Sequence, residues 1–256
     1  MRYFIMVTME TCSHLYSNEV GVLCIKILTE GENVMKYKVQ IFLSFLKSLP
    51  LNISLFGLKK GIKIPFLVNY NTTIKVKKNT IVIPDDFPFL GFRFGIGGSM
   101  GIPVLSRNSL IIEPGAKLVL NGKCHISNGS SIRIDDGEVN LGKNFSANKN
   151  FLLTASERIF IHDDVTCGWN VSIRDSDGHT MFHNGIELVN KSAVEIGENC
   201  WINSWCDILK GVEIDDNCVV AYKSLITSSI TQHDTSFTLI GGHPAKVIRK
   251  NISWKK

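Results

Sequence analysis

A hydrophobic residue returns at every sixth position late in the chain, and this period constrains the fold more than any other feature. The series runs without a slip through Ile196, Ile202, Ile208, Ile214, Val220 and Ile226. Four positions after each member stands a small or aliphatic residue: Cys200, Cys206, Val212, Cys218, Ser224 and Ile230. An amphipathic helix needs apolar residues three and four apart, and a half-buried strand needs alternation, so neither explains a strict period of six.

A triangular parallel β-helix explains this period. Each short strand occupies one face of a prism, three hexapeptides complete one turn, and the repeated aliphatic side chain points into the axis while turns stack at ~4.8 Å. The same step appears upstream in Leu141, Ala147 and Leu153, and again in Ile161, Cys167 and Ile173. A looser version is carried by Leu118, Leu120, Ile126 and Ile132. We therefore predict an all-β chain that folds as a parallel β-helix of hexapeptide repeats.

The domain boundaries follow from where the period begins and ends. Residues 1–107 lack it and are expected to form a leader and a less regular cap over the open end of the prism. Residues 108–232 are expected to form the β-helix, interrupted by an outward loop at 179–193. Residues 233–256 then form a C-terminal tail.

The most hydrophobic window, Ile41–Leu58, lies within the expected cap. Lys47, Pro50 and Asn52 interrupt it, so we expect a short helix, a break and a second apolar piece, not a membrane crossing. The glycine-rich stretch Gly91–Gly101 is not followed by a helical pattern, which favours tight turns over a nucleotide-binding loop.

The segment of residues 35–80 holds nine lysines and neither aspartate nor glutamate. It is either a solvated basic face or a peripheral contact with an anionic membrane surface. Cys200, Cys206 and Cys218 occupy positions of the repeat where Val or Ala would serve, which indicates buried free thiols and a reducing compartment. These features favour a cytoplasmic protein, at the inner face of the cell membrane if the basic segment binds lipid.

A solenoid gains no stability from interrupting its own repeat, so the loop at 179–193 is where function is expected. It begins at the last residue of the stretch IRDSDGH. The imidazole of His179 can take a proton from an alcohol, and Asp175 or Asp177 can fix its tautomer and stabilise the cation. Two alternatives remain open. The stretch is either a plain turn, or His179 and His183 are zinc ligands.

Three stretches of the sequence resemble a known family. They are IRDSDGH (173–179), IGENCWINSWCDILKGVEIDDNCVVAYKSLI (196–226) and GGHPAKVIRKNISW (241–254). Their combination is similar to the hexapeptide-repeat O-acyltransferases, which have a left-handed β-helix and use acetyl-CoA. Within that family the chain most resembles the branch that acetylates capsular or other surface polysaccharides and their sugar precursors.

The resemblance implies a set of catalytic residues. His179 would be the general base, with Asp177 as its first candidate partner and Asp175 as the second. Trp201 matches a family tryptophan that lines the place where the acetyl donor meets the acceptor.

The resemblance also implies contacts to acetyl-CoA. The implied residues are Trp201, Asn203, Ser204, Lys210, Gly211, Ala221, Lys223, Ser224, Gly242, Pro244, Ala245, Lys246, Arg249 and Lys250. Asn203 stands where the family usually has glycine, and Tyr222 and Lys223 also depart from the family pattern, at points where the family's backbone approaches the cofactor closely. The three cations of the tail suit the phosphates of CoA, because charge-assisted hydrogen bonds to phosphate are strong.

The resemblance implies a carbohydrate acceptor and a homotrimer with its active sites between subunits. Neither a metal nor a nucleic-acid partner is expected. Two other functions remain as alternatives: a zinc hydro-lyase of the γ-carbonic anhydrase type, and a non-catalytic β-helix scaffold.

Overall fold

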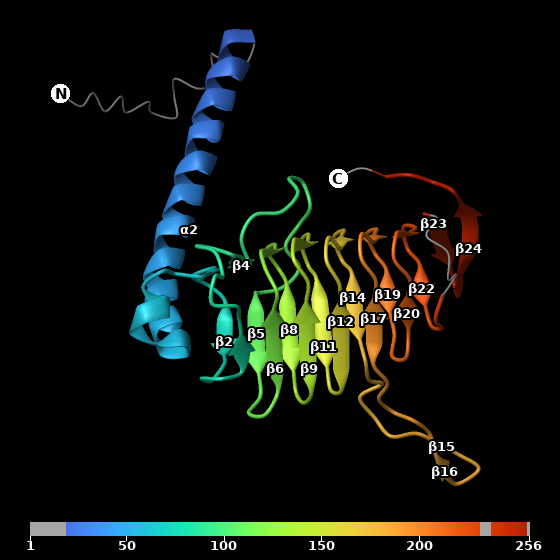
Figure 1. Cartoon of the computed structure of the whole chain (residues 1–256). Helices are drawn as coiled ribbons and strands as arrows, with labels where there is room; N and C mark the ends of the chain where they lie inside the picture. The colour runs from blue at the N-terminus through green and yellow to red at the C-terminus, as the bar shows by residue number, and fades with distance from the viewer. Residues whose placement is uncertain (1–18, 231–236, 255–256) are drawn as a thin grey trace, which may run out of the picture. The chain divides into compact units, whose positions relative to one another are not determined.

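The computed structural model describes residues 19–230 and 237–254, with side chains from residue 37 onward. The chain divides into two compact units between Leu43 and Ser44, inside helix α2 (Glu19–Gly61). The second unit carries the strands of the described chain. Apart from the β15–β16 hairpin and the antiparallel last strand β24, they form three parallel sheets visited in a fixed order (Figure 1). We name these sheets face A, face B and face C, and the turns between them the AB, BC and CA corners.

Each face is built from strands that recur once per turn of the chain. Face A contains β1 (Phe66–Val68), β4 (Phe92–Phe94), β7 (Cys124–Ile126), β10 (Phe145–Ala147), β13 (Thr166–Cys167), β18 (Trp201–Ile202), β21 (Cys218–Val220), β23 (Thr238–Gly242) and β24 (Ala245–Lys250). Face B contains β2 (Thr73–Lys75), β5 (Ser109–Ile112), β8 (Ser131–Ile134), β11 (Leu152–Ala155), β14 (Ser172–Arg174), β19 (Asp207–Ile208) and β22 (Leu225–Ile226). Face C contains β3 (Ile81–Val82), β6 (Lys117–Leu120), β9 (Glu138–Leu141), β12 (Arg158–Ile161), β17 (Val194–Ile196) and β20 (Glu213–Ile214).

The residues of the sixfold repeat fill the axis of the prism. Ile208 lies between Ile173 and Ile226 in the register of face B, and all three are 0% exposed. On face A the stacked core residues are Ala147, Cys167, Ile202 and Val220, so small and aliphatic side chains of successive turns pack directly on one another. This arrangement confirms the predicted parallel β-helix and is that of the left-handed prism implied by the resemblance.

The cysteines of the repeat are buried thiols outside any disulfide, as expected from their positions. Cys200, Cys206 and Cys218 are at most 1% exposed, and Cys124 and Cys167 are also buried and not disulfide-bonded. Burial raises the pKa of the Cys124 thiol to about 12 and raises that of Cys206. These thiols therefore act as small apolar core groups.

The prism begins earlier than predicted. Strands β1, β2 and β3 pair in parallel with β4, β5 and β6, so the first turn starts at Phe66 and not near residue 108. The connections that follow, at 83–91 between β3 and β4 and at 95–108 between β4 and β5, are longer than in a hexapeptide. The sixfold period is therefore absent from this part of the sequence, although the chain already forms the first turns of the parallel β-helix there.

The N-terminal helix also differs from the expectation of two short pieces. Helix α2 continues through Pro50, and its non-helical residue is Gly57, with φ 74° and ψ 172°. Glycine reaches this left-handed φ without a steric penalty. The predicted break therefore lies seven residues later than the proline that was expected to cause it.

One side of this helix closes the open edge of face A through polar side chains. Ser44, Ser48 and Asn52 are each 0% exposed and form what we call the capping stripe. Asn52 accepts from the Phe66 amide at 3.0 Å and donates to its carbonyl at 2.8 Å. Ser48 Oγ accepts from Val68 N and Ser44 Oγ from Tyr70 N, both at 3.0 Å. Strand β1 therefore meets side chains where a preceding strand would have been.

Lys47 adds a further contact next to the capping stripe. Its ammonium donates to the carbonyls of Tyr70 and Thr72, at 2.9 and 2.5 Å. Burial lowers the pKa of Lys47. The lysine that interrupts the apolar window thus extends the closure of β1.

Among the described residues, one helix is long and apolar enough to cross a membrane by length and composition, Tyr37–Gly61, with a mean hydropathy of 1.6. The capping stripe hydrogen-bonds this helix to protein from Ser44 to Asn52. Unlike a soluble amphipathic helix, α2 buries polar residues here and leaves apolar ones such as Leu46 and Leu49 exposed.

We predict that Asn52→Leu lowers the free energy of unfolding by about 2–4 kcal/mol, because it leaves the buried amide and carbonyl of Phe66 without partners. The measurement is urea unfolding followed by circular dichroism. Ser54→Leu, on an exposed position of the same helix, is the matched control and should change stability by less than about 0.5 kcal/mol. Equal stability of the two variants would contradict a capping role.

Candidate active site

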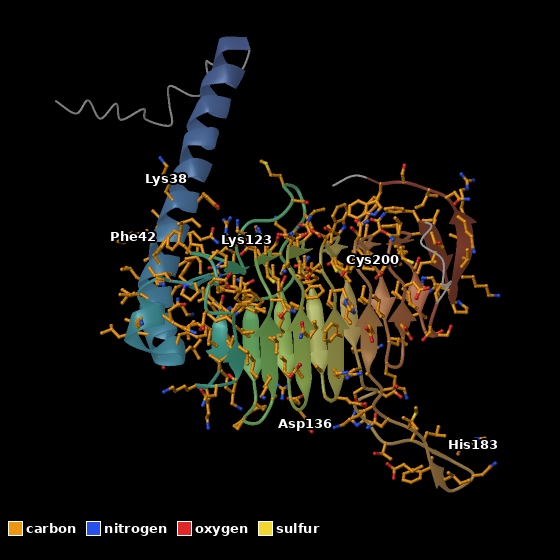
Figure 2. All side chains as sticks on the ribbon, viewed as in Figure 1. Lys38, Phe42, Lys123, Asp136, His183 and Cys200 are labelled. Atoms are coloured by element: carbon orange, nitrogen blue, oxygen red, sulfur yellow. The ribbon has the colours of Figure 1, made fainter. Side chains whose placement is uncertain are left out.

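The loop that interrupts the repeat leaves the prism at the BC corner, between β14 and β17. It runs over residues 175–193 and contains the antiparallel hairpin β15 (Phe182–His183) and β16 (Ile186–Glu187). Figure 1 shows it projecting away from the prism, and the label of His183 in Figure 2 marks its far part. The interruption seen in the sequence is therefore an outward loop, as predicted.

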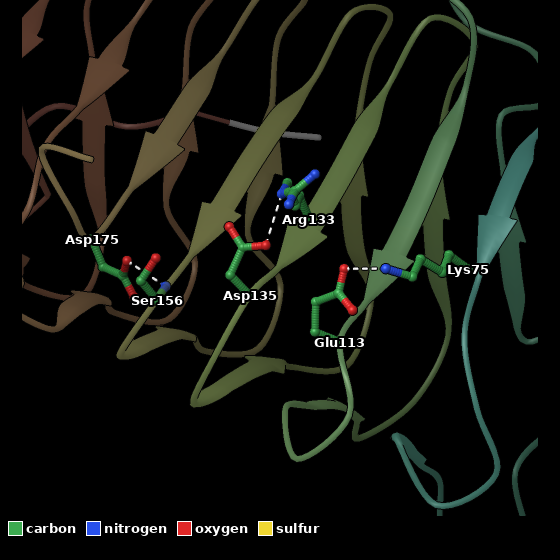
Figure 3. Close-up of polar contacts among 6 residues, drawn as sticks. All are labelled: Lys75, Glu113, Arg133, Asp135, Ser156 and Asp175. Carbon is green, nitrogen blue, oxygen red and sulfur yellow. Dashed lines mark hydrogen bonds and ion pairs between the residues drawn. The ribbon is translucent and has the colours of Figure 1, made fainter. Parts of the chain in front are cut away.

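Asp175 lies at the base of the loop and supports the prism. It is 0% exposed, and its two carboxylate oxygens accept from the amides of Ser156 and Glu157, each at 2.8 Å (Figure 3). Both donors belong to the preceding turn of the prism at the same corner. The carboxylate is thus fully engaged away from His179, which removes Asp175 as a partner of that histidine in this conformation.

Asp177 is held by Lys210 and not by His179. Its carboxylate is 2.5 Å from Lys210 Nζ, and the same ammonium donates to the Val189 carbonyl. The Gly211 amide donates to Ser192 O at 3.0 Å, on the returning strand of the loop. Lys210 and Gly211, which the resemblance placed along the cofactor, therefore fasten both ends of the loop at the BC corner.

His179 stands on the exposed part of the loop. Within the described residues its ring makes no hydrogen bond, so either ring nitrogen is open to a substrate or to another protein chain. His183 is also exposed, and its Nε2 lies 3.3 Å from Asn184 Nδ2. The described residues contain no cluster of three or more His, Cys, Asp or Glu that could hold a metal ion.

The tip of the loop carries unusually apolar side chains for a projecting segment. Five of them are exposed: Met181, Phe182, Ile186, Leu188 and Val189. The base of the loop, in contrast, is fastened by the contacts of Asp177, Lys210 and Gly211. A held base with an exposed apolar tip is a surface suited to contact with another protein chain.

Many of the predicted cofactor residues gather at the AB corner, on the other side of the prism. Ser204 Oγ accepts from Trp169 N at 3.1 Å, and Ser224 Oγ donates to Ala221 O at 2.7 Å. Asn203 precedes the first of these serines and accepts from its amide at 2.7 Å. Both hydroxyls therefore hold the backbone of the corner.

The C-terminal tail packs against the same corner. The Gly242 amide donates to Ser224 Oγ at 3.3 Å, and the ring of His243 hydrogen-bonds Lys223 O. Pro244 follows directly, and Ala245 is buried at the start of β24. The structure thus brings the predicted residues of the tail together with those of the last turns.

The three cations of the tail lie on β24, which turns back antiparallel on β23. Lys246, Arg249 and Lys250 are exposed there. Lys223 is also exposed and places its ammonium 5.6 Å from the ring centroid of Tyr222. By register Lys246 lies opposite Gly241 near the AB corner, whereas Arg249 and Lys250 lie farther along β24, opposite Leu239 and Thr238. The last edge of face A is therefore rich in positive charge, which fits a polyphosphate group.

Trp201 lies on face A and points outward, since its neighbour Ile202 fills the core. Its ring centroid is 5.8 Å from that of Trp254. The indole Nε1 of Trp254 is buried and finds no hydrogen-bond partner in the described part of the chain. Sequence reasoning included Trp254 in a motif but gave it no role, because only the folded tail brings it to Trp201.

Trp205 is a second tryptophan that sequence reasoning missed. It occupies the left-handed region, with φ 62°, at the AB corner. The equivalent residue of the preceding turn is Asn170, with φ 56°, and asparagine adopts this region far more readily than a bulky residue. Its signal in the sequence was the replacement of the usual asparagine by tryptophan at a corner position.

Within one chain the predicted residues form two separate groups. His179, Asp177 and Lys210 lie at the BC corner, whereas Ser204, Ser224 and the tail lie at the AB corner. Face B separates these corners, so the base and the cofactor residues do not meet across the surface of a single prism.

Comparison with known proteins supports the interpretation of the repeat. The family model described as bacterial transferase hexapeptide (six repeats) matches residues 193–228. The galactoside O-acetyltransferase of Escherichia coli (strain K12) is 33% identical over 155 residues, which cover 57% of this chain and 70% of the relative. The chain belongs to the hexapeptide-repeat acetyltransferase family.

Two further similarities are more distant. A protein described as "Putative lipopolysaccharide biosynthesis O-acetyl transferase WbbJ" of Escherichia coli (strain K12) is 26% identical, over 52% of this chain and 78% of its own. A solved galactoside acetyltransferase in complex with coenzyme A is 25% identical, covering 57% of this chain and 64% of that one, with a TM-score of 0.39.

We predict unequal losses of stability for the two aspartates of the motif. Asp175→Asn should lower stability by about 2–3 kcal/mol, because the amide side chain offers one acceptor to two backbone amides and Asp175 itself is buried. Asp177→Asn removes a partly exposed ion pair and should cost at most about 1 kcal/mol. Thermal unfolding of both variants provides the measurement, and a larger loss for Asp177→Asn would refute the structural role assigned to Asp175.

Proposed function

We propose that the protein transfers an acetyl group from acetyl-CoA to a hydroxyl of a surface polysaccharide or of its sugar precursor. The observation that carries this proposal is the similarity to the galactoside O-acetyltransferase over most of that relative's length, together with an exposed histidine on the loop. The more distant similarity to a protein of lipopolysaccharide biosynthesis supports a surface glycan as the acceptor.

Acetyl transfer requires a general base, a binding surface for acetyl-CoA and a binding surface for the acceptor. His179 removes the proton of the acceptor hydroxyl as its oxygen attacks the thioester carbonyl. The new C–O bond forms, the C–S bond breaks, and the CoA thiolate takes the proton from the imidazolium. A base of this kind supplies ~10²–10⁴-fold in rate.

Acetyl-CoA would lie along the AB corner toward the tail. Lys246, Arg249 and Lys250 offer charge to the phosphates. Trp201 would stand near the acetyl end. The reaction then requires a base that a single prism does not bring to this corner.

A second copy of the chain can supply that base, so we propose a homotrimer with each site between two subunits. The loop has the form this needs, because its base is fastened by Lys210 and its apolar tip, which includes Phe182 and Ile186, is exposed. Burying the tip on a neighbour would carry His179 to the neighbour's cofactor surface.

The mutation His179→Ala should lower kcat by about 10²–10⁴-fold while leaving the KM for acetyl-CoA nearly unchanged, because the base does not hold the donor. The measurement is acceptor-dependent thiol release from acetyl-CoA. His183→Ala, on the same exposed loop, is the matched control and should keep its rate. Equal loss in both variants would favour the zinc hydro-lyase interpretation, and absence of acetyl-CoA binding would favour a scaffold.

We also propose that the enzyme works at the cytoplasmic surface of a membrane, where lipid-linked glycans are available. Helix α2 exposes apolar residues such as Leu46 and Leu49 in unit 2, and Lys59 is exposed farther along the same helix. Apolar side chains beside lysines are suited to the boundary of an anionic bilayer.

Binding to vesicles tests the membrane proposal. The protein should co-sediment with vesicles containing anionic phospholipid at physiological salt and much less with neutral ones, because each lysine near the surface contributes about 1 kcal/mol. The double variant Leu46→Ser, Leu49→Ser should weaken the binding, whereas Ser54→Ala should not. Equal sedimentation with both vesicle types would contradict the electrostatic part of the proposal.

A further inference from the structure

Face A carries a continuous outward row of side chains that leads away from Trp201. The register of successive strands aligns Trp201 with Thr166, Thr166 with Ser146, and Ser146 with His125. Arg93 follows next to His125 on β4. Since each step is one strand spacing of ~4.8 Å, Arg93 lies ~19 Å from Trp201 along the face.

Residues of this row line two adjoining hollows on the surface. The larger, of about 460 Å³, is lined among others by Arg93, Lys123 and His125. The smaller, of about 200 Å³, shares His125 and Ser146 with it and extends to Thr166. Together they form a groove along face A, which we call the face A groove.

The far end of the groove is positively charged. Arg93 and Lys123 both line it, and no aspartate or glutamate lines either hollow in the described part of the chain. Lys123 is labelled in Figure 2. An arginine and a lysine side by side, without a matching acid, favour an anionic ligand.

Arg93 also has an unsatisfied donor. Its Nε is buried, and no hydrogen-bond partner for it exists among the described residues. A buried donor without a partner costs free energy, and more when it belongs to a charged group. A carboxylate or phosphate oxygen of a ligand would satisfy it.

His125 complements these charges with a neutral ring. Its Nε2 lies 2.8 Å from the carbonyl of Ile96, so this nitrogen donates and Nδ1 is left to accept. Burial lowers the pKa of His125, against the opposing effect of the Ile96 hydrogen bond, and the charge of Arg93 lowers it further. A neutral histidine that accepts, beside the hydroxyls of Ser146 and Thr166, suits sugar hydroxyl groups.

We propose that the face A groove binds an acidic oligosaccharide, with an anionic group of one sugar held by Arg93 and Lys123 and the chain extending toward Trp201. This inference rests on the proposed function, which requires a glycan acceptor. It adds that the acceptor is anionic and that it is recognised about four strands away from the place of transfer.

Direct binding tests the groove without relying on catalysis. Isothermal titration would compare an oligosaccharide that contains uronic or sialic acid with its carboxyl-reduced counterpart. The acidic form should bind at least about tenfold more tightly, and Arg93→Gln should weaken it by about 10–100-fold, as expected for one charge-assisted hydrogen bond. Arg158→Gln, an exposed arginine on face C, is the matched control and should bind as the natural protein does.

Two further arms identify the anion and protect the test from misfolding. Lys123→Gln, at an exposed position, should also weaken binding even if Arg93→Gln unfolds. If inorganic phosphate or a sugar phosphate bound the groove through Arg93 and the acidic oligosaccharide did not, the anion would be a phosphate. That result would overturn the assignment to an acidic sugar. A rise in the KM for acetyl-CoA in Arg93→Gln, with glycan binding unchanged, would assign the groove to the donor and also overturn it.

The groove and the proposed function fail in different ways. If no acetyl transfer occurs with any acceptor but the acidic oligosaccharide still binds through Arg93, the proposed function is wrong and the groove stands. If transfer proceeds equally well with acidic and carboxyl-reduced acceptors, and Arg93→Gln retains the natural KM for the acceptor, the proposal for the groove is wrong and the proposed function stands.

Discussion

The prism depends on the satisfaction of backbone hydrogen bonds along its axis. Each turn supplies partners for the turn before and the turn after, so only the first and the last turns have a free edge. The capping stripe resolves this at the beginning, where Asn52 replaces an entire peptide group for Phe66. The antiparallel return of β24 onto β23 gives the last strand of face A a partner at the other end. The interior turns can then remain short and regular.

This construction separates the chemistry of the surface from the stability of the core. The inward positions are filled by residues such as Ile202 and Ile208, whereas the outward positions of the same strands hold Trp201 and Asp207. A loop can leave at a corner without disturbing the core, provided that its two ends are fastened. Asp175 and Lys210 provide the fastening here, which explains why residues close to the motif serve the fold more directly than the reaction.

Much of the fold could be predicted from the sequence because the interior repeats without error. The period of six in Ile196 to Ile226 reports on the core directly, and the structure places each of these residues at the axis. The first turn could not be found in this way, since the long connections at 83–91 and 95–108 separate it from the regular repeat. The capping stripe was also invisible, because Ser44, Ser48 and Asn52 look like interruptions of an apolar helix until their partners on β1 are known.

The candidate site could be predicted only in part. The break in the repeat located the loop, but the contacts of Asp175 and Lys210 depend on which turn lies beneath them, and sequence spacing does not contain that information. Motif matching placed Lys210 and Ser204 in one group, whereas they lie at different corners of the prism. The arrangement of Arg93, His125 and Trp201 in one row escaped notice because these residues are far apart in the sequence and meet only through the register of face A.

The two ends of the prism are closed in different ways, and this affects how the number of turns can change during evolution. Neither the capping stripe nor the return of β24 contacts the middle turns of the prism, so a whole turn can be gained or lost there while both ends remain closed. The spacing between Arg93 and Trp201 can then vary only in steps of one strand. Distances along one face of the prism are therefore multiples of the strand spacing, and the number of turns between two residues sets the distance between them.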